Sequence, residues 1–393
     1  MQTKPTSLKL QIFLLTIMRG MMNINTRMVY PFLMVFARGL GVDLKTISGT
    51  LTIRAVFGML TPFLAPLAEK HSRRAGMLLG MAMFALGSGL VVLWPSLITF
   101  AIAMSITFLG MYVYMSAVQA YLGDHVPYAQ RGRAMGTFEL AWSFSFIVGM
   151  PLLGFLIGRY GWQAPFPILA IFGLIALIII RVFIPNSLPE GNGQGSQMLS
   201  SLKNVLAAPA ARASLLLIFT FLLGNEMINL MFGVWLEDTF ALKITGLGAA
   251  SIILGLADLS GEGLSTVIID KLGKERTIRI ALAASAAASL SMPFARNSLA
   301  LTLAALFLIY LSFEVAFISM MTLSSEIMPK ARATLMASNV AAVSLGRGVG
   351  AIISPMLYGV GFIANAGAAV LFAAIAFWLV SKVKVKEQPL PHL

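Results

Sequence analysis

The sequence has no cysteine, only three histidines and few charged residues of either sign. The missing cysteines exclude disulfides, thiolate metal sites and cysteine nucleophiles. His71, His125 and His392 lie outside the long apolar runs, so we expect no buried histidine cluster that could bind a metal. The sequence also lacks a nucleotide-binding loop. We therefore expect no cofactor and no enzymatic activity.

Acidic residues are also scarce: 15 Asp and Glu stand against 28 Lys and Arg, which gives a formal net charge of +13. In a soluble protein such a charge would suggest nucleic acid as a partner. Here, however, 58% of the residues are hydrophobic and only 11% are charged, too few to cover a surface that faces water. The composition therefore predicts a protein whose solvent is the lipid bilayer, with no nucleic-acid partner.

Long apolar runs, each of about 20 residues, follow one another along the chain. Backbone polar groups must be satisfied internally in hydrocarbon, and the alternation typical of barrel strands is absent, so each run predicts a helix. The expected spans are residues 10–37, 46–68, 76–94, 97–121, 134–158, 164–184, 213–237, 246–269, 277–295, 299–325, 333–359 and 362–381.

The distribution of basic residues predicts the orientation of these spans. Most of the 28 Lys and Arg residues lie in loops and tails on the same side as the N-terminus. Positive loops stay in the cytoplasm, so we expect a multi-pass protein of the cell inner membrane with both termini cytoplasmic. The first run carries Arg19, Asn23, Asn25 and Arg27 without a small-residue cleavage site, so we expect it to remain in the mature protein.

A charged loop occurs twice, about 200 residues apart: residues 69–74 (EKHSRR) are similar to residues 270–276 (DKLGKER). A second pair keeps nearly the same spacing, because residues 124–127 (DHVP) are matched by residues 326–329 (EIMP). We interpret the chain as a duplicated half. Two similar halves of membrane-spanning helices are typical of secondary transporters, whose substrate site lies between the halves.

The halves are expected to meet at one polar connection. Residues 190–195 (EGNGQG) have the composition of a flexible linker. We therefore expect an N-terminal six-helix bundle, a cytoplasmic linker and a C-terminal six-helix bundle at residues 1–185, 186–211 and 212–393, respectively.

The first charged loop resembles the signature Gly-x-Leu-Ala-Asp-Arg-x-Gly-Arg-Arg of the major facilitator superfamily, found between its second and third helices. Residues 65–74 (APLAEKHSRR) follow this pattern, although Ala65 and Ser72 replace the two glycines. The second copy, at residues 270–276, follows the eighth span as that family requires. The resemblance implies an all-α membrane fold of twelve helices in two pseudo-symmetric bundles, and secondary transport by alternating access. We also expect a monomer.

In that family the two loops form a latch that favours the outward-open state. The residues to which the resemblance assigns this role are Glu69, Lys70, Arg73, Arg74, Asp270, Lys271 and Arg276. Their charges can pair across the halves and with helix ends. The alternative is that they only set the orientation of the chain in the membrane.

The fifth span contains Gly149, Pro151 and Gly154, similar to a motif in that helix of the drug:proton antiporters of the superfamily. Glycine permits close helix approach and proline opens the hydrogen-bond ladder, so the motif predicts a bend or a tight crossing. Ordinary packing explains it about as well. That branch also carries an arginine four residues before a glycine in the fourth helix, where this chain has Ile106 and Gly110.

Charged residues inside the spans carry most of the functional information, because each costs a few kcal/mol near the bilayer centre and persists only if paired, hydrated or needed. These residues are Arg19, Arg27, Arg54, Glu139, Glu226, Asp258, Glu262, Glu314 and Arg347. Glu139 is expected near the interface, as a partner of Arg131 or Arg133. The candidate substrate and coupling-ion residues are Arg27, Arg54, Glu226, Asp258, Glu262 and Glu314.

Two arrangements of these charges are predicted. Arg27 and Glu226 occupy equivalent places in the repeat, so we expect an ion pair between the halves. Asp258 and Glu262 lie four residues apart on one helix face, where two close acids favour retention of a proton on one of them. The alternative is that every charge belongs to a fixed structural pair.

Together these features predict a secondary transporter that exports amphiphilic small molecules, coupled to protons. Two other functions stay open. The arginines in the spans would suit an organic anion or a lysolipid, and a chain of the same fold could serve as a receptor or scaffold without transport. The 24 methionines favour an adaptable apolar cavity. The expected partners are a small-molecule substrate, protons and the lipid bilayer.

Overall fold

The computed structural model describes residues 7–60, 72–186 and 198–383. The helices of the N-terminal half are α1 (Leu8–Arg27), α2 (Leu33–Leu40), α3 (Leu44–Met59), α5 (Arg73–Leu93), α6 (Leu97–His125), α7 (Tyr128–Glu139), α8 (Ala141–Phe144), the π-helical turn η1 (Ser145–Gly149), α9 (Met150–Tyr160) and α10 (Pro165–Phe183).

The rest of the described chain is helical too. Its helices are α11 (Met198–Ala207), α12 (Pro209–Asn229), α13 (Phe232–Phe240), α14 (Ile244–Leu272), α15 (Lys274–Ser291), the 3-10 turns η3 (Met292–Ala295) and η4 (Pro329–Ala331), α16 (Leu299–Ile327), α17 (Arg332–Tyr358) and α18 (Phe362–Val380). Several helices begin at capping residues that accept a hydrogen bond from a backbone N–H three residues on: Asp43, Ser72 and Ser96.

The predicted twelve-helix membrane fold is confirmed. Ten helices in the described part of the chain are long and apolar enough to cross a membrane, and α1 with α2, and α3, provide the first two spans. The first span is not one helix, as the run at 10–37 predicted, because it breaks between Arg27 and Leu33. Pro31 lies in this break, and proline cannot donate the helical hydrogen bond. Residues 61–68 of the second predicted span lie outside the described residues.

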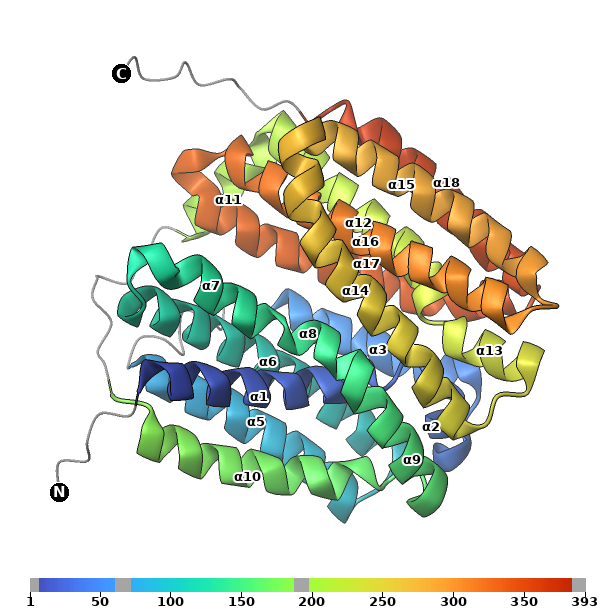
Figure 1. The fold of residues 1–393 in the computed structure, drawn as a ribbon, viewed down its shortest axis with the longest axis horizontal. Helices are drawn as coiled ribbons and strands as arrows, with labels where there is room; N and C mark the ends of the chain where they lie inside the picture. Colours follow the sequence, from blue (N-terminus) through green and yellow to red (C-terminus); the bar gives the residue numbers. More distant parts are fainter. Residues whose placement is uncertain (1–6, 61–71, 187–197, 384–393) are drawn as a thin grey trace.

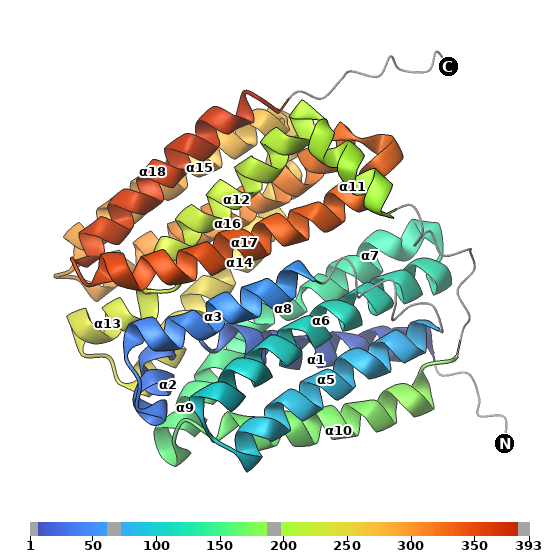
Figure 2. The ribbon, with the colours of Figure 1, turned by 180° about the vertical axis from the view of Figure 1, so that it is seen from behind.

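Two bundles lie side by side, with α1 to α10 in one and α12 to α18 in the other (Figure 1). At one end of the molecule α1 begins and α18 ends, and we call this end the terminal face. Seen from behind, α2 and α13 lie together at the other end, the opposite face (Figure 2). Arg38 and Glu237 form an ion pair of 2.6 Å between these two helices. The halves therefore touch at the opposite face.

Two pairs of helices hold the halves together, and both use small residues. α3 packs on α17 and α9 packs on α14. An added Cβ on Gly348 would lie 2.8 Å from the Cβ of Ala55, and one on Gly154 would lie 3.2 Å from the Cα of Gly248. Such close backbone approach is typical of membrane helix interfaces. The two pairs of helices are related by the repeat: α3 corresponds to α14, and α9 corresponds to α17. Each half therefore contributes one helix to each of the two contacts.

The predicted linker contains a helix. α11 lies within residues 186–211 and packs against α12 and α17, with Val205 buried beside Ala211 and Leu335. The glycine-rich stretch 190–195, on which the expectation of flexibility rested, lies outside the described residues. The sequence analysis missed α11 because its ten residues are too few to span a membrane and lie next to that glycine-rich stretch.

Candidate functional site

A cavity of about 300 Å³ lies between the two halves. Its wall is largely apolar and includes aromatic rings and flexible thioethers, among them Phe108, Met111, Met115, Phe317 and Met321. All six candidate substrate and ion residues line it, together with Arg19, Glu139 and Arg347. The sequence thus identified the cavity charges, and the structure shows how they are paired.

The first inter-half contact in the cavity wall is an ion pair between Arg27 of α1 and Asp258 of α14. Arg27 Nη2 lies 2.7 Å from Asp258 Oδ2, and both side chains are buried. Arg27 Nη1 also donates to the carbonyl of Trp142, just before the π-helical turn η1. The guanidinium stands 3.5 Å from the ring centre of Phe146 and 4.0 Å from that of Trp142. Arg27 is therefore held by a carboxylate, a carbonyl and two aromatic faces.

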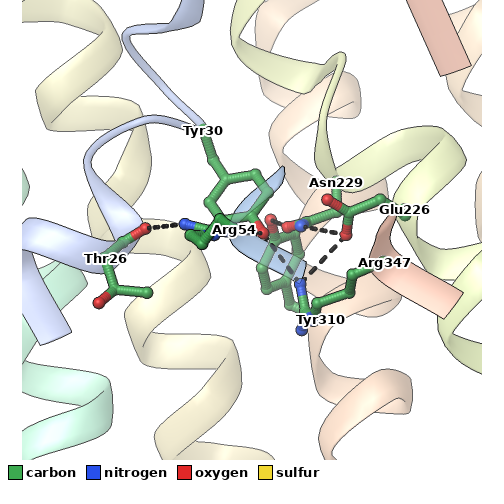
Figure 3. A network of polar contacts seen from close by, with 7 residues as sticks. All are labelled: Thr26, Tyr30, Arg54, Glu226, Asn229, Tyr310 and Arg347. Carbon is green, nitrogen blue, oxygen red and sulfur yellow. Dashed lines mark hydrogen bonds and ion pairs between the residues drawn. The ribbon is translucent and has the colours of Figure 1, made fainter. Parts of the chain in front are cut away.

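The predicted pair between Arg27 and Glu226 is wrong. Glu226 of α12 instead pairs with Arg347 of α17, at 3.1 Å between Oε2 and Nη1. Asn229 donates to the same Glu226 oxygen at 3.0 Å, and Tyr310 donates to Asn229 (Figure 3). Equivalent places in a repeat fix depth along a helix but not the direction in which a side chain points.

Arg54 of α3 is a cavity cation with no carboxylate partner in the described part of the chain. Its Nη1 donates to the Thr26 carbonyl at 3.1 Å, and its Nη2 donates to the Tyr30 hydroxyl at 3.0 Å (Figure 3). Arg347 Nη1 donates to the same hydroxyl at 3.2 Å. Two guanidinium groups, one from each half, therefore meet at the single phenol oxygen of Tyr30. Tyr30 lies in the non-helical segment between α1 and α2, and this segment places its hydroxyl group between the two arginines.

Two cavity acids lack a cation partner among the described residues. Glu262 of α14 accepts a hydrogen bond from Ser143 at 3.2 Å, and Glu314 of α16 has neither an ion pair nor a hydrogen bond there. Glu314 is only 8% exposed. An added Cβ on Gly261 would lie 2.7 Å from Glu314 Cβ, so the two helices cross closely at this point. Of the predicted acidic pair, Asp258 is engaged by Arg27, and Glu262 is not engaged by an arginine.

The remaining cavity pair corrects the expected partner of Glu139. Arg19 Nη2 lies 2.5 Å from Glu139 Oε2, and Arg19 Nη1 donates to the Phe138 carbonyl. Glu139 therefore partners Arg19 and not Arg131 or Arg133. This contact ties α1 to α7 within the N-terminal half.

Helix positions order the charges by depth. With a rise of about 1.5 Å per residue, Arg54 lies roughly 15 Å from the start of α3 at the opposite face. Glu262 lies roughly 15 Å from the end of α14 at the terminal face, and Glu314 roughly 20 Å from the end of α16. The unpaired cation thus lies toward the opposite face, Glu262 lies toward the terminal face, and Glu314 lies near the middle of α16.

The proposed latch residues are only partly described. Glu69 and Lys70 lie outside the described residues. Arg73 Nε lies 3.0 Å from Asp124 Oδ2, and Arg74 donates to the Ile184 carbonyl at 3.3 Å. In the second half, Asp270, Lys271 and Arg276 are exposed.

The repeat also preserves an ion pair that the sequence did not predict. Lys274 pairs with Glu326 at the place where Arg73 pairs with Asp124 in the first half. Each pair joins the start of one helix to the end of the next within its own half. The matched spacing of the acidic and basic motifs could have revealed these contacts.

The glycine and proline motif lies at two crossings. An added Cβ on Gly149 would lie 2.4 Å from Ile24 of α1, and Gly154 faces Gly248 of α14. Pro151 follows the π-helical turn, in the first turn of α9. The structure thus shows both a local irregularity and a tight crossing.

Several residues of the site escaped sequence reasoning. Trp142 and Phe146 cover Arg27, Ser143 holds Glu262, and Tyr310 supports Asn229. Aromatic and serine residues are common in membrane helices, so nothing in the sequence singles these out. Arg19 and Arg347 were recognised as buried charges without an assigned role.

Comparison with known proteins supplies the family. The family model described as Major Facilitator Superfamily matches residues 12–351 and also residues 214–392. The chain belongs to the major facilitator superfamily. The second match begins in the C-terminal half, as expected for a repeated unit.

Relatives within the superfamily include proteins of Bacillus subtilis (strain 168). The uncharacterized MFS-type transporter YceJ is 28% identical over 298 residues, covering 75% of each chain. Multidrug resistance protein 2 is 22% identical over 264 residues, covering 65% of this chain and 66% of that protein. The crystal structure of a D-xylose-proton symporter shares the fold, with a TM-score of 0.76 and 17% identity over 96% of this chain and 99% of that one.

Proposed function

We propose that this superfamily member is a secondary transporter that exports amphiphilic small molecules in exchange for protons. The observation that carries the proposal is that two cavity carboxylates, Glu262 and Glu314, have no cation partner among the described residues. In this reading the terminal face is cytoplasmic, the protein lies in the cell inner membrane, and the chain works as a monomer.

The carboxylates supply the coupling. A carboxylate in an apolar wall needs a cation, water or a proton, because its charge is costly there. Glu314 faces the cavity without an arginine, so it is free to exchange a proton or a ligand cation with the cavity. Glu262 lies one turn from Asp258, whose charge is engaged by Arg27. We propose that Glu262 and Glu314 carry the protons and that Asp258 and Arg27 form the hinge contact between the halves.

The cavity wall supports an amphiphilic substrate. Phenylalanine rings and methionine side chains adapt to apolar bodies of varied shape. Ionised groups at both ends of the cavity can bind a polar head. The similarity to Multidrug resistance protein 2 agrees with such a substrate.

Alternating access would use the contacts between the halves. We propose that residues 1–185 and 212–393 move as two bodies joined by the linker at 186–211. The halves touch at the opposite face through the Arg38 and Glu237 pair and through the close approach of Gly233 to Pro31. We propose that these contacts close that face. The latch residues Asp270, Lys271 and Arg276, with their counterparts Arg73 and Arg74 and the acidic loop before them, would act at the terminal face in the other state.

Proteoliposomes test the proposal. Efflux of a lipophilic cation, tetraphenylphosphonium, should be driven by an imposed pH gradient. Glu262→Gln or Glu314→Gln should reduce this flux at least tenfold while the purified variant keeps its unfolding temperature. Glu275→Gln, an exposed acid on α15, is the matched control and should transport normally. Full gradient-driven flux in both cavity variants would contradict the coupling assignment. Binding without any flux in the wild type would favour the receptor or scaffold alternative.

A further inference from the structure

We infer that Arg54, Arg347 and Tyr30 form a subsite for an oxyanion, such as a carboxylate, sulfonate or phosphate group, on an amphiphilic ligand. The inference deepens the proposed function, on which it rests for the transport pathway. It adds an acidic head group to the substrate class and places that group in the cavity wall, where Arg54 and Arg347 meet at the Tyr30 hydroxyl (Figure 3).

The geometry is that of two convergent donors. Arg54 and Arg347 come from different halves, and each donates a hydrogen bond to the Tyr30 hydroxyl, at 3.0 and 3.2 Å. A guanidinium is a planar fork with five N–H donors that matches the oxygens of carboxylate and phosphate groups. The neutral phenol oxygen of Tyr30 is a weak hydrogen-bond acceptor for two guanidinium groups. An oxyanion that replaces it would bridge the two arginines.

The charge balance points the same way. Arg19, Arg27 and Arg347 each form an ion pair with a carboxylate, whereas Arg54 has none in the described part of the chain. Its two acceptors, the Thr26 carbonyl and the Tyr30 hydroxyl, are neutral. With Glu226 counted against Arg347, this end of the cavity keeps one uncompensated positive charge.

Aromatic contacts do not remove the need for an anion. The Arg54 guanidinium lies 4.9 Å from the ring centre of Phe108 and 5.7 Å from that of Tyr30. A cation over an aromatic face recovers only part of the hydration that it loses on burial. Arg54 is 4% exposed, so water compensates little of the rest. A transient negative ligand explains why a buried cation without a carboxylate persists here.

The acids of the cavity fix the ligand's direction. Glu262 lies toward the terminal face and Glu314 near the middle of α16, and both repel an anion, whereas Arg54 lies toward the opposite face and attracts it. The apolar body of the ligand then lies between them, along Phe108, Met111 and Met115. The ligand is thus an amphiphile that carries its acidic group in front as it enters from the terminal face.

Binding can be measured without any pH gradient, so its outcome is independent of proton coupling. The protein in nanodiscs is titrated with three ligands of one apolar body: 2-naphthalenesulfonate, 2-naphthylmethanol and 2-naphthylmethylammonium. The sulfonate should bind the wild type at least tenfold more tightly than the alcohol. Arg54→Gln should lose at least this factor for the sulfonate and leave the affinity of the alcohol unchanged within threefold.

A double variant keeps the test valid if Arg54→Gln does not fold. Arg347→Gln combined with Glu226→Gln removes both charges of one ion pair, so that no buried charge is left without its partner. This double variant should weaken sulfonate binding at least threefold. Its matched control, Lys274→Gln with Glu326→Gln, removes an ion pair between α15 and α16 that lies outside the cavity wall and should bind the sulfonate as the wild type does. Equal affinity of the wild type for the three ligands, or equal losses in the two double variants, would overturn the subsite.

Discussion

Arg27 and Asp258 form a buried ion pair of 2.7 Å that joins α1 of one half to α14 of the other. The pair stands in the wall of the cavity, with the rings of Trp142 and Phe146 over the guanidinium. It is one of the few polar contacts that cross between the bundles close to the middle of the spans. Changes to it should therefore report on both stability and transport.

Removing one member of this pair should destabilise the protein more than removing both. Arg27→Met leaves Asp258 as a buried charge without a partner, at a cost of about 3 to 5 kcal/mol, whereas replacing both with apolar residues is often nearly neutral. Thermal unfolding of Arg27→Met, Asp258→Leu and the combination measures this. The control is Arg27→Met with Glu226→Leu, which should be less stable than Arg27→Met alone. Recovery of stability in the control would show that Glu226 is the partner of Arg27 after all.

A side chain at Gly233 should open the opposite face. An added Cβ there would lie 2.6 Å from the backbone carbonyl oxygen of Pro31, and backbone cannot move aside as a side chain can. Gly233→Val should therefore shift the population toward a state that is open at the opposite face. Because the sequence has no cysteine, spin labels on Lys45→Cys and Lys243→Cys can report the distance between the two halves at the opposite face.

The matched control for that experiment is Gly246→Ala. Its added Cβ would meet the side chain of Leu242 at 3.6 Å, an ordinary contact. The distance distribution should stay as in the labelled parent. An unchanged distribution in Gly233→Val would mean that the contact with Pro31 yields without moving the halves.

Asp270→Asn should favour the state seen here. Asp270 is exposed at the end of α14, so its charge contributes little in this state. In the proposed latch, its charge stabilises the state in which the terminal face is closed. Spin labels on Tyr128→Cys and Leu272→Cys should therefore report longer distances on average. Glu275→Gln, which removes a nearby exposed acid, is the control and should leave the distribution unchanged. The same distribution in Asp270→Asn and its parent would restrict the loop to orienting the chain.

The cap of α3 should give the protein a stability term that depends on pH. Hydrogen bonds from the side chain and backbone N–H of Thr46 lower the pKa of Asp43 below its ordinary value of 3.8. A lowered folded pKa contributes stability above the ordinary value, and the contribution is lost as the pH falls through the folded pKa. Asp43→Ala should thus unfold at a lower temperature than the wild type at neutral pH.

The difference in unfolding temperature between Asp43→Ala and the wild type should shrink as the pH falls below 3.8, because the carboxylate of Asp43 then becomes protonated in the wild type. Asp43→Asn keeps an acceptor without a charge, so its stability should not follow this titration. An effect of Asp43→Ala that is constant with pH would show that the charge of the cap is irrelevant.

Much of the fold could be predicted because lipid imposes simple rules on the chain. The twelve apolar runs gave the spans, and the paired charged loops revealed the repeat. The breaks inside spans were harder. The helix stops at Arg27 and resumes at Leu33 although the apolar run continues, because hydropathy does not register where a backbone turns.

The pairing of the charges was beyond the sequence. Repeat register placed Arg27 and Glu226 at similar depth, yet helix rotation and tilt direct Arg27 to Asp258 and Glu226 to Arg347. Rotation is fixed by close contacts of small residues such as Gly350, where an added Cβ would lie 2.6 Å from the Cβ of Glu226. Contacts of this kind join residues that are far apart in the chain and leave no periodic trace in one sequence.

The π-helical turn at Ser145–Gly149 has a consequence for anyone who compares this chain with its relatives. A π turn holds about one residue more than the α-turn that it replaces. Residues before and after it, such as Glu139 and Gly154, therefore face directions that a regular helical wheel assigns wrongly. An alignment without a gap here would pair the wrong faces with any relative whose helix is regular in this span, and deletion of one residue from the turn would rotate α9 relative to α7 by about 100°.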